Sequence, residues 1–249
     1  MLSVRKIMNK ISLITVFNNQ SMVDEMINSA KRQNDADTEF IMIDNRDNKF
    51  NSAAAALNYG AEKASGDVLV FLHQDIEFLS DDVLKKIYNF AMNNKNVIFG
   101  AAGVLSKAEE KSGAILANFY HGNDKSKYDT IDKPTKCFTL DECLIACCKD
   151  IMAKVRFDER VCDGWHLYGA DLCLSANLEK DLSVMVVPMN IWHKSNGNAD
   201  KSYMITQDRL AKKYKGKYSV INTTNGYTYT NGVKRALLNL YRKIKYRGV

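Results

Sequence analysis

The sequence lacks the features that mark membrane-spanning and exported proteins. It contains no run of about 18 apolar residues, the length needed for a transmembrane helix. Met1 to Lys10 have neither an apolar signal core nor a small-residue cleavage site. The six cysteines fit no disulfide framework in a chain of 249 residues. We therefore expect a cytoplasmic protein with an ordinary buried core, consistent with a composition that is 46% hydrophobic.

Glycine-rich phosphate-binding motifs are also missing. Neither G-x-G-x-x-G nor G-x-x-x-x-G-K-[ST] occurs after any segment that reads as a strand. This absence argues against a dinucleotide-dependent enzyme and against a P-loop nucleotidase. The residues near 15–25 also lack the Gly-rich basic loop expected of a sugar-nucleotide nucleotidyltransferase.

Acidic residues are missing from the C-terminal part of the chain. Arg209 to Val249 contain 11 of the 35 lysines and arginines and none of the 29 acidic residues. The remainder is mildly acidic, although the whole chain has a net charge of +6. We expect a main domain over residues 1–208 and a basic extension over 209–249. This asymmetry predicts a polyanionic or membrane partner for the extension and argues against a nucleic-acid-binding protein overall.

The first third of the chain alternates between strand and helix patterns. The run of five apolar residues at 68–72 is too short for a globular helix, and its continuity predicts a strand covered on both faces. Short connections in the order β-α-β-α-β indicate parallel strands, and so an α/β fold with a mostly parallel sheet. The predicted elements are strands at 11–17, 39–43 and 68–72, and helices from Ser21 to about 34 and from Ser52 to 64.

The rest of the chain has weaker signals. Residues 106–136 are polar and suggest a long loop, and residues 139–155 are mixed and apolar. Cys143 and Cys147 are spaced to share one helix face, which suggests either a metal site or buried thiols; we favour burial. Further predicted elements are a helix capped by Ser80, strands at 97–105 and 184–187, and helices at 171–180 and 232–247.

Polar side chains follow each of the three early strands. Asn18 ends the first, Asp44 the second, and His73-Gln74-Asp75 the third. Ligands of open α/β sheets bind beyond the carboxyl ends of the strands, so these groups are well placed for chemistry. A simpler interpretation is that Asp75 only opens a turn.

A second dense group of polar and aromatic residues lies at 164–172. Asp171 could act as a base or serve only as a helix N-cap. Trp165 and His166 could line a ligand pocket, which would be the acceptor pocket under the family resemblance described below, although Trp165 would fit equally well in the core. His193, in a later loop, reads on its own as a packed or surface histidine.

Taken together, these motifs resemble the family 2 glycosyltransferases with the GT-A fold, in a subgroup with His-Gln-Asp where relatives carry Asp-x-Asp. The similarity covers most of residues 11–195. The motifs that carry it, in order, are Val16-Phe17-Asn18, Ile43-Asp44-Asn45, Ala56 to Gly60, Ala64 to Asp67, Phe71 to Asp75, Phe157-Asp158-Glu159, Gly169-Ala170-Asp171 and His193.

The resemblance implies roles for individual residues. It implies a GT-A domain over 1–208, with Asp171 as general base and Asp75 and His193 as ligands of Mn²⁺ or Mg²⁺. His73 replaces the first acid of the motif, Leu57 stands where many relatives have an arginine, and Ala170 removes an acid beside the base. The residues implied to bind the donor are Val16, Asn18, Asp44, Asn58, His73, Gln74 and Asp75.

The implied reaction moves a sugar from a nucleotide-sugar, expected to be a UDP-sugar, to a hydroxyl of a glycan or lipid-linked acceptor. One base gives a single displacement and inversion; a double displacement would need a second carboxylate, for which Asp163 is the nearest candidate. Donor hydrolysis and a non-catalytic carbohydrate-binding protein remain alternatives.

The segment 232–249 forms a basic amphipathic helix pattern. It could lie on the inner face of an anionic membrane, or pack on the body of the protein. Nothing in the sequence indicates the number of subunits.

Overall fold

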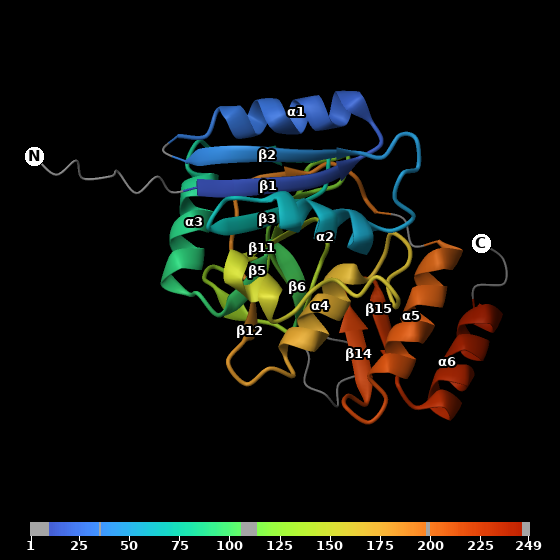
Figure 1. Ribbon diagram of the computed structural model, residues 1–249. Helices are drawn as coiled ribbons and strands as arrows, with labels where there is room; N and C mark the ends of the chain where they lie inside the picture. Colours follow the sequence, from blue (N-terminus) through green and yellow to red (C-terminus); the bar gives the residue numbers. More distant parts are fainter. Residues whose placement is uncertain (1–9, 35, 106–113, 198–199, 246–249) are drawn as a thin grey trace, which may run out of the picture.

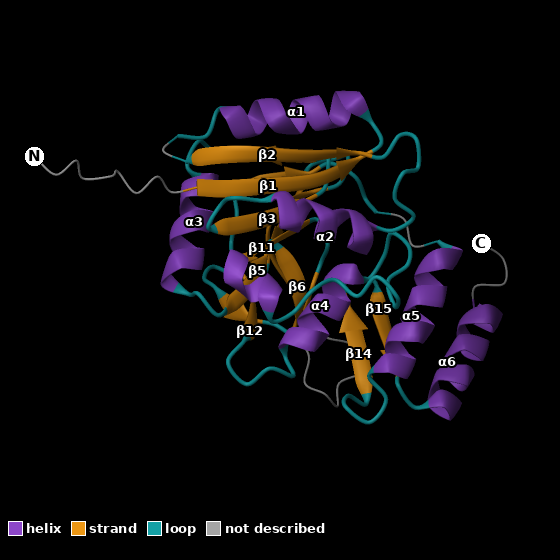
Figure 2. Ribbon diagram, viewed as in Figure 1, coloured by secondary structure: helices purple, strands orange, loops and turns teal. Residues whose placement is uncertain are grey.

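The computed structural model describes residues 10–34, 36–105, 114–197 and 200–245. Its centre is a seven-stranded sheet in the order β2-β1-β3-β11-β5-β12-β9, with helices on both faces (Figures 1 and 2). A second sheet has the order β10-β6-β7-β13-β4, with β8 paired to β7, and β14 and β15 form a separate hairpin. The α/β class predicted from the sequence is confirmed.

The N-terminal part follows the predicted alternation of strands and helices. β1 pairs in parallel with both β2 and β3. Asn19, rather than Ser21, caps α1: its side chain accepts a hydrogen bond from the Met22 N–H. Ser52, where the second helix was predicted to begin, is the N-cap of α2. The bounds are β1 Lys10–Phe17, α1 Gln20–Lys31, β2 Asp37–Asp44, α2 Ala53–Lys63, β3 Val68–Leu72 and β4 Ile76–Phe78.

The central sheet is only partly parallel. β11, Leu144–Cys148, runs antiparallel to both of its neighbours, β3 and β5. The start of β11 therefore lies at the same edge as the end of β3, and the His73 N–H donates to the Cys143 carbonyl at 3.0 Å. Cys143 and Cys147 are buried, as expected, but they lie in and beside a strand and not on a helix face.

The region from 97 to 140 differs most from the prediction. The expected strand at 97–105 breaks at Ala101 into two strands of different sheets, because β5 pairs with β11 and β6 pairs with β7. The predicted loop at 106–136 is wrong over its described part, where three strands form; residues 106–113 lie outside the described residues. The bounds are β5 Val97–Gly100, β6 Ala102–Leu105, β7 Ala114–His121, β8 Ser126–Asp129, β9 Thr135–Lys136 and β10 Thr139–Leu140.

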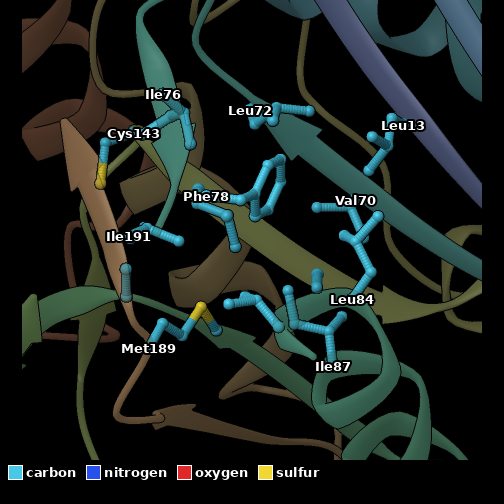
Figure 3. Packing of buried hydrophobic residues seen from close by; sticks show 14 of the residues in the cluster. Leu13, Val70, Leu72, Ile76, Phe78, Leu84, Ile87, Cys143, Met189 and Ile191 are labelled. Atoms are coloured by element: carbon cyan, nitrogen blue, oxygen red, sulfur yellow. The ribbon is translucent and has the colours of Figure 1, made fainter. Parts of the chain in front are cut away.

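β3 contributes to both faces of the sheet, which explains its unbroken apolar run. Val70 and Leu72 pack with Leu84 and Ile87 of α3, a helix that begins after Asp82 and not at Ser80 (Figure 3). The alternate β3 residues join α2, α4 and the Phe157 ring on the other face. The remaining elements of this body are α3 Val83–Asn93, the short 3-10 helix Lys149–Ala153, α4 Tyr168–Ala176, β12 Ser183–Val186 and β13 Ile191–His193.

The C-terminal segment continues the body of the protein. α5 runs across the expected boundary at 208, and Leu210 and Tyr214 pack against Leu174 of α4 in a third apolar cluster. α6 lies outside α5 and the β14–β15 hairpin (Figure 1). Within the described residues no helix is long and apolar enough to cross a membrane. The bounds are α5 Lys201–Lys213, β14 Val220–Thr223, β15 Gly226–Tyr229 and α6 Gly232–Lys245.

Candidate functional site

Two adjoining cavities open at the edge where β1 and β3 end. The larger, about 770 Å³, follows the ends of these strands, and the smaller, about 360 Å³, lies against β7 and β13. His73, Glu142 and Trp165 line both cavities. These three side chains therefore mark the junction between the two spaces.

Most of the predicted donor-binding residues line the larger cavity: Val16, Asn18, His73, Gln74 and Asp75. Gln74 also joins the two strand ends. Its side-chain oxygen accepts from the Asn18 and Asn19 N–H groups at 3.0 and 2.9 Å, and its amide donates to the Asn18 side chain at 2.8 Å. Gln74 thus fixes the shape of the cavity wall.

Two predicted donor-binding residues lie outside both cavities. Asn58 is buried and donates from its amide to the Phe157 carbonyl at 2.9 Å and to Glu159 at 2.8 Å, so it anchors α2. Asp44 is half-exposed and paired with Arg46, which lowers the pKa of the Asp44 carboxyl to about 2. Arg46 itself lines the larger cavity and is the one lysine or arginine among the residues that do so.

His73, Asp75 and His193 converge on one point of the wall. One ligand atom from each lies within 4.8 Å of the others, and no other such group of three occurs among the described residues. His193 Nε2 is 3.3 Å from His73 Nδ1 and 3.4 Å from Asp75 Oδ1. The antiparallel pairing of β13 with β4 brings His193 opposite Ile76, directly after Asp75.

The chemistry of this cluster suits a cation. Although burial alone would raise it, hydrogen bonds and charge from His193 hold the pKa of Asp75 well below its usual range. Burial, with the neighbouring His193, lowers the pKa of His73 to about 4, so its imidazole is neutral and able to ligate. Two imidazoles and one carboxylate fit a first-row transition metal better than Mg²⁺, which prefers oxygen ligands.

The smaller cavity collects all four histidines of the chain, His73, His121, His166 and His193. His121 at the end of β7 lies 3.2 Å from His193, Nδ1 to Nδ1. His166 Nε2 lies 3.3 Å from an Asp200 oxygen. Trp165 is 44% exposed, so it lines the cavity instead of the core. Phe119 and Tyr128 add aromatic surface.

Asp171 does not reach either cavity. Its side chain is fully buried in the first turn of α4, where both carboxylate oxygens accept from Lys213 Nζ, at 2.7 and 2.9 Å. The Tyr214 hydroxyl donates to the same carboxylate at 2.9 Å. This placement does not support the prediction of Asp171 as a base; it ties α4 to α5.

The sequence interpretation missed Glu142. Its carboxylate accepts from the Gly169 N–H at 3.2 Å, and burial, then the adjacent Asp141 charge, raise the pKa of Glu142 to about 8. Glu142 comes just before the apolar strand β11. If β11 ran parallel to β3, its start would lie at the edge of the sheet opposite the site, so the sequence pattern did not mark Glu142. It reaches the site because β11 runs antiparallel. His121 was missed because its region was interpreted as a loop.

The fold and the strand-end cluster define a GT-A type protein. A glycosyltransferase like family matches residues 12–218, and the chain belongs to it. The predicted resemblance is therefore confirmed. A relative from Fuscovulum blasticum, named ATP synthase subunits region ORF 6, is 23% identical over 217 residues, covering 82% of this chain and 83% of the relative.

Two solved structures share the fold. GalNAc-T7, with UDP, GalNAc and Mn²⁺, superimposes with a TM-score of 0.61 at 12% identity, over 84% of this chain and 48% of that one. TarS 1-349 of S. aureus, in complex with UDP, gives 0.55 at 12% identity, over 81% and 64%. The chain thus spans about half of the first protein's length.

Proposed function

We propose that the protein transfers a sugar from a UDP-sugar to a hydroxyl acceptor with inversion. The observation that carries this proposal is the pair of adjoining cavities that share His73, Glu142 and Trp165. The larger cavity holds the donor, with Val16, Asn18, His73, Gln74 and Asp75 on its wall. The smaller holds the acceptor, so the sugar crosses at the junction.

The residues of the larger cavity supply complementary groups for a nucleoside diphosphate. Arg46 brings a cation. His73 and Asp75 of this cavity, with His193 from the adjoining smaller cavity, would hold a transition metal, for which Mn²⁺ is our choice. When bound, the metal would neutralise charge that develops on the departing diphosphate. The two related structures with UDP, one of which also contains Mn²⁺, support this choice.

The placement of carboxylates supports a single displacement. Asp163, the earlier candidate for a second nucleophilic acid, is more than half exposed, pairs with Arg209 and lines neither cavity. A retaining reaction by double displacement needs a carboxylate on the face of the sugar opposite the base. Inversion therefore fits the described acids better than retention.

Calorimetric titration with UDP and UDP-sugars, with and without Mn²⁺, tests the donor site. We expect Mn²⁺-dependent UDP binding that Asp75→Ala weakens at least tenfold, because the charged ligand of the cation is lost. Asp181→Ala, an exposed acid paired with Lys154, is the matched control. Absence of nucleotide binding in the wild type would contradict the proposal and favour a non-catalytic carbohydrate-binding protein. The anomeric configuration of the product, read by NMR, tests inversion.

α6 carries an apolar stripe that the body leaves uncovered. Its side chains are 55–71% exposed, from Val233 to Ile244. The opposite face holds the helix to the body through polar contacts: Arg235 Nε lies 2.8 Å from Asp208, and Arg242 donates to the Tyr227 carbonyl at 2.6 Å. The stripe consists of Val233, Leu237, Leu240, Tyr241 and Ile244.

We infer that this stripe lies on an anionic membrane, where lipid-linked acceptors are found. Exposed Lys234 and Lys243 flank it, and no acidic residue occurs after Asp208, so the charge complements anionic headgroups. Sedimentation with phosphatidylserine vesicles should capture the wild type, and Leu237→Gln with Tyr241→Gln should abolish capture. Phosphatidylcholine vesicles are the control. Equal capture of the double variant would contradict the inference.

A further inference from the structure

Glu142 occupies the junction of the two cavities. The hydrogen bond from the His73 N–H to the Cys143 carbonyl sets the turn before β11 beside the end of β3, and Glu142 is the residue just before Cys143 in that turn. Of the three residues that line both cavities, Glu142 alone carries a carboxylate. It is therefore an acid that faces the donor and the acceptor spaces together.

The start of α4 holds Glu142 in this position. Gly169 donates its N–H to the Glu142 carboxylate at 3.2 Å, within the turn where helix N–H groups lack helical partners. Gly169 also leaves room for the side chain, since a Cβ there would lie 3.1 Å from Glu142 Cγ and 2.7 Å from Ile145 Cδ1. The position of the carboxylate is thus set by both hydrogen bonding and packing.

We propose that Glu142 is the general base of the transfer, an inference that rests on the proposed function. The acceptor oxygen forms a bond to the anomeric carbon, while the bond from that carbon to the diphosphate oxygen breaks. The electron pair of the broken bond leaves with the diphosphate. The acceptor hydroxyl proton passes to the Glu142 carboxylate.

The surroundings of Glu142 suit this role. Burial and the Asp141 charge raise the pKa of Glu142 to about 8, close to the pH at which a cellular base works best. The charge of Glu142 acts on Tyr168 and Cys173 of α4, on Cys162 in the loop before α4, and on Tyr203 of α5. None of these is a cation that would hold it as a carboxylate in an ion pair.

The test compares Glu142→Gln with the wild type, using release of UDP from UDP-glucose, UDP-galactose and UDP-N-acetylglucosamine in the presence of Mn²⁺. We expect kcat to fall by roughly 10²- to 10⁴-fold, the usual loss of a general base. Glutamine retains the acceptor oxygen for Gly169, so UDP affinity by calorimetry should stay within about twofold. Asp181→Asn is the matched control.

A pH profile separates a base from a structural residue. Wild-type kcat/KM should rise with pH to a plateau through an apparent pKa near that of Glu142, and Glu142→Asp should retain a rising limb at a shifted midpoint. Folding of each variant is checked by circular dichroism. Turnover by Glu142→Gln within tenfold of the wild type would overturn the assignment while the proposed function stands. A wild type that binds no UDP would instead reject the proposed function.

Discussion

Glu142 is a partly buried acid beside the first turn of α4, Asp171 is a fully buried acid within that turn, and their surroundings differ in kind. Asp171 has a cation, Lys213, and a hydroxyl, Tyr214, and faces only protein. Glu142 has a backbone N–H and no cation among its described contacts, and it faces two cavities. An acid whose charge is balanced within the fold thus serves as a structural tie, whereas an acid at a cavity with no cation beside it is available for proton transfer.

The largest expected effect on stability comes from breaking the Asp171 pair. Asp171→Ala leaves Lys213 with only Asp158, 2.9 Å away, and leaves the Tyr214 hydroxyl without its carboxylate partner. We expect the free energy of unfolding to fall by about 3 kcal/mol, the lower end for removal of one member of a buried pair. Urea denaturation measures it. Asp181→Ala, at an exposed pair, should change it by less than about 1 kcal/mol.

A second expected effect concerns the pH dependence of stability. Because the folded pKa of Glu142 is about 8 and so lies above its unfolded value, the folded state binds the proton more tightly. The contribution of Glu142 to the free energy of unfolding is fully present below its unfolded pKa and is lost as the pH rises through about 8. Glutamine does not titrate, so Glu142→Gln should not lose stability in this way. At pH 8 its free energy of unfolding should exceed that of the wild type by on the order of 1–3 kcal/mol.

Urea midpoints of both proteins at pH 5 and pH 8 measure that difference. The difference in urea midpoint between Glu142→Gln and wild type should widen toward pH 8. A gap that narrows or stays constant would show that Glu142 is ionised in the folded protein at neutral pH. The same experiment on Asp181→Asn should show no widening of this sign, because the hydrogen bond from Lys154 lowers the pKa of Asp181.

The smallest expected effect tests the packing that positions Glu142. Gly169→Ala places a methyl 2.7 Å from Ile145 Cδ1, a flexible side-chain end, and 3.1 Å from Glu142 Cγ. Ile145 can turn aside, but Glu142 must shift by a few tenths of an ångström. We expect kcat to fall about tenfold, as small misplacements of catalytic groups do, with UDP affinity unchanged. Ala170→Gly, in the same turn, is a control; equal kcat losses in both would mean that disturbing α4 itself is the cause.

The polar residues at the ends of the first and third strands could be predicted from the sequence, because their placement depends only on the local pattern of strands and helices. The alternation of strands and helices up to residue 72 was predicted, and with it the gathering of Asn18, Gln74 and Asp75 at one edge. Parallel strands end at the same edge of a sheet, so polar residues at their carboxyl ends meet without further information. Asp44 and Asn58, predicted to bind the donor, line neither cavity, because their side chains bond to Arg46 and Glu159.

What the sequence by itself determined is therefore the fold class and the cluster of polar groups after β3. The tertiary structure alone decided that β11 runs antiparallel, which brings Glu142 to the site, and that β7 carries His121 to the other histidines. It also decided that Asp171 turns toward α5 instead of a cavity. Periodicity in a sequence reports which side chains are buried. The direction of a strand and the partner of a buried charge depend on segments far away in the chain, and only packing selects them.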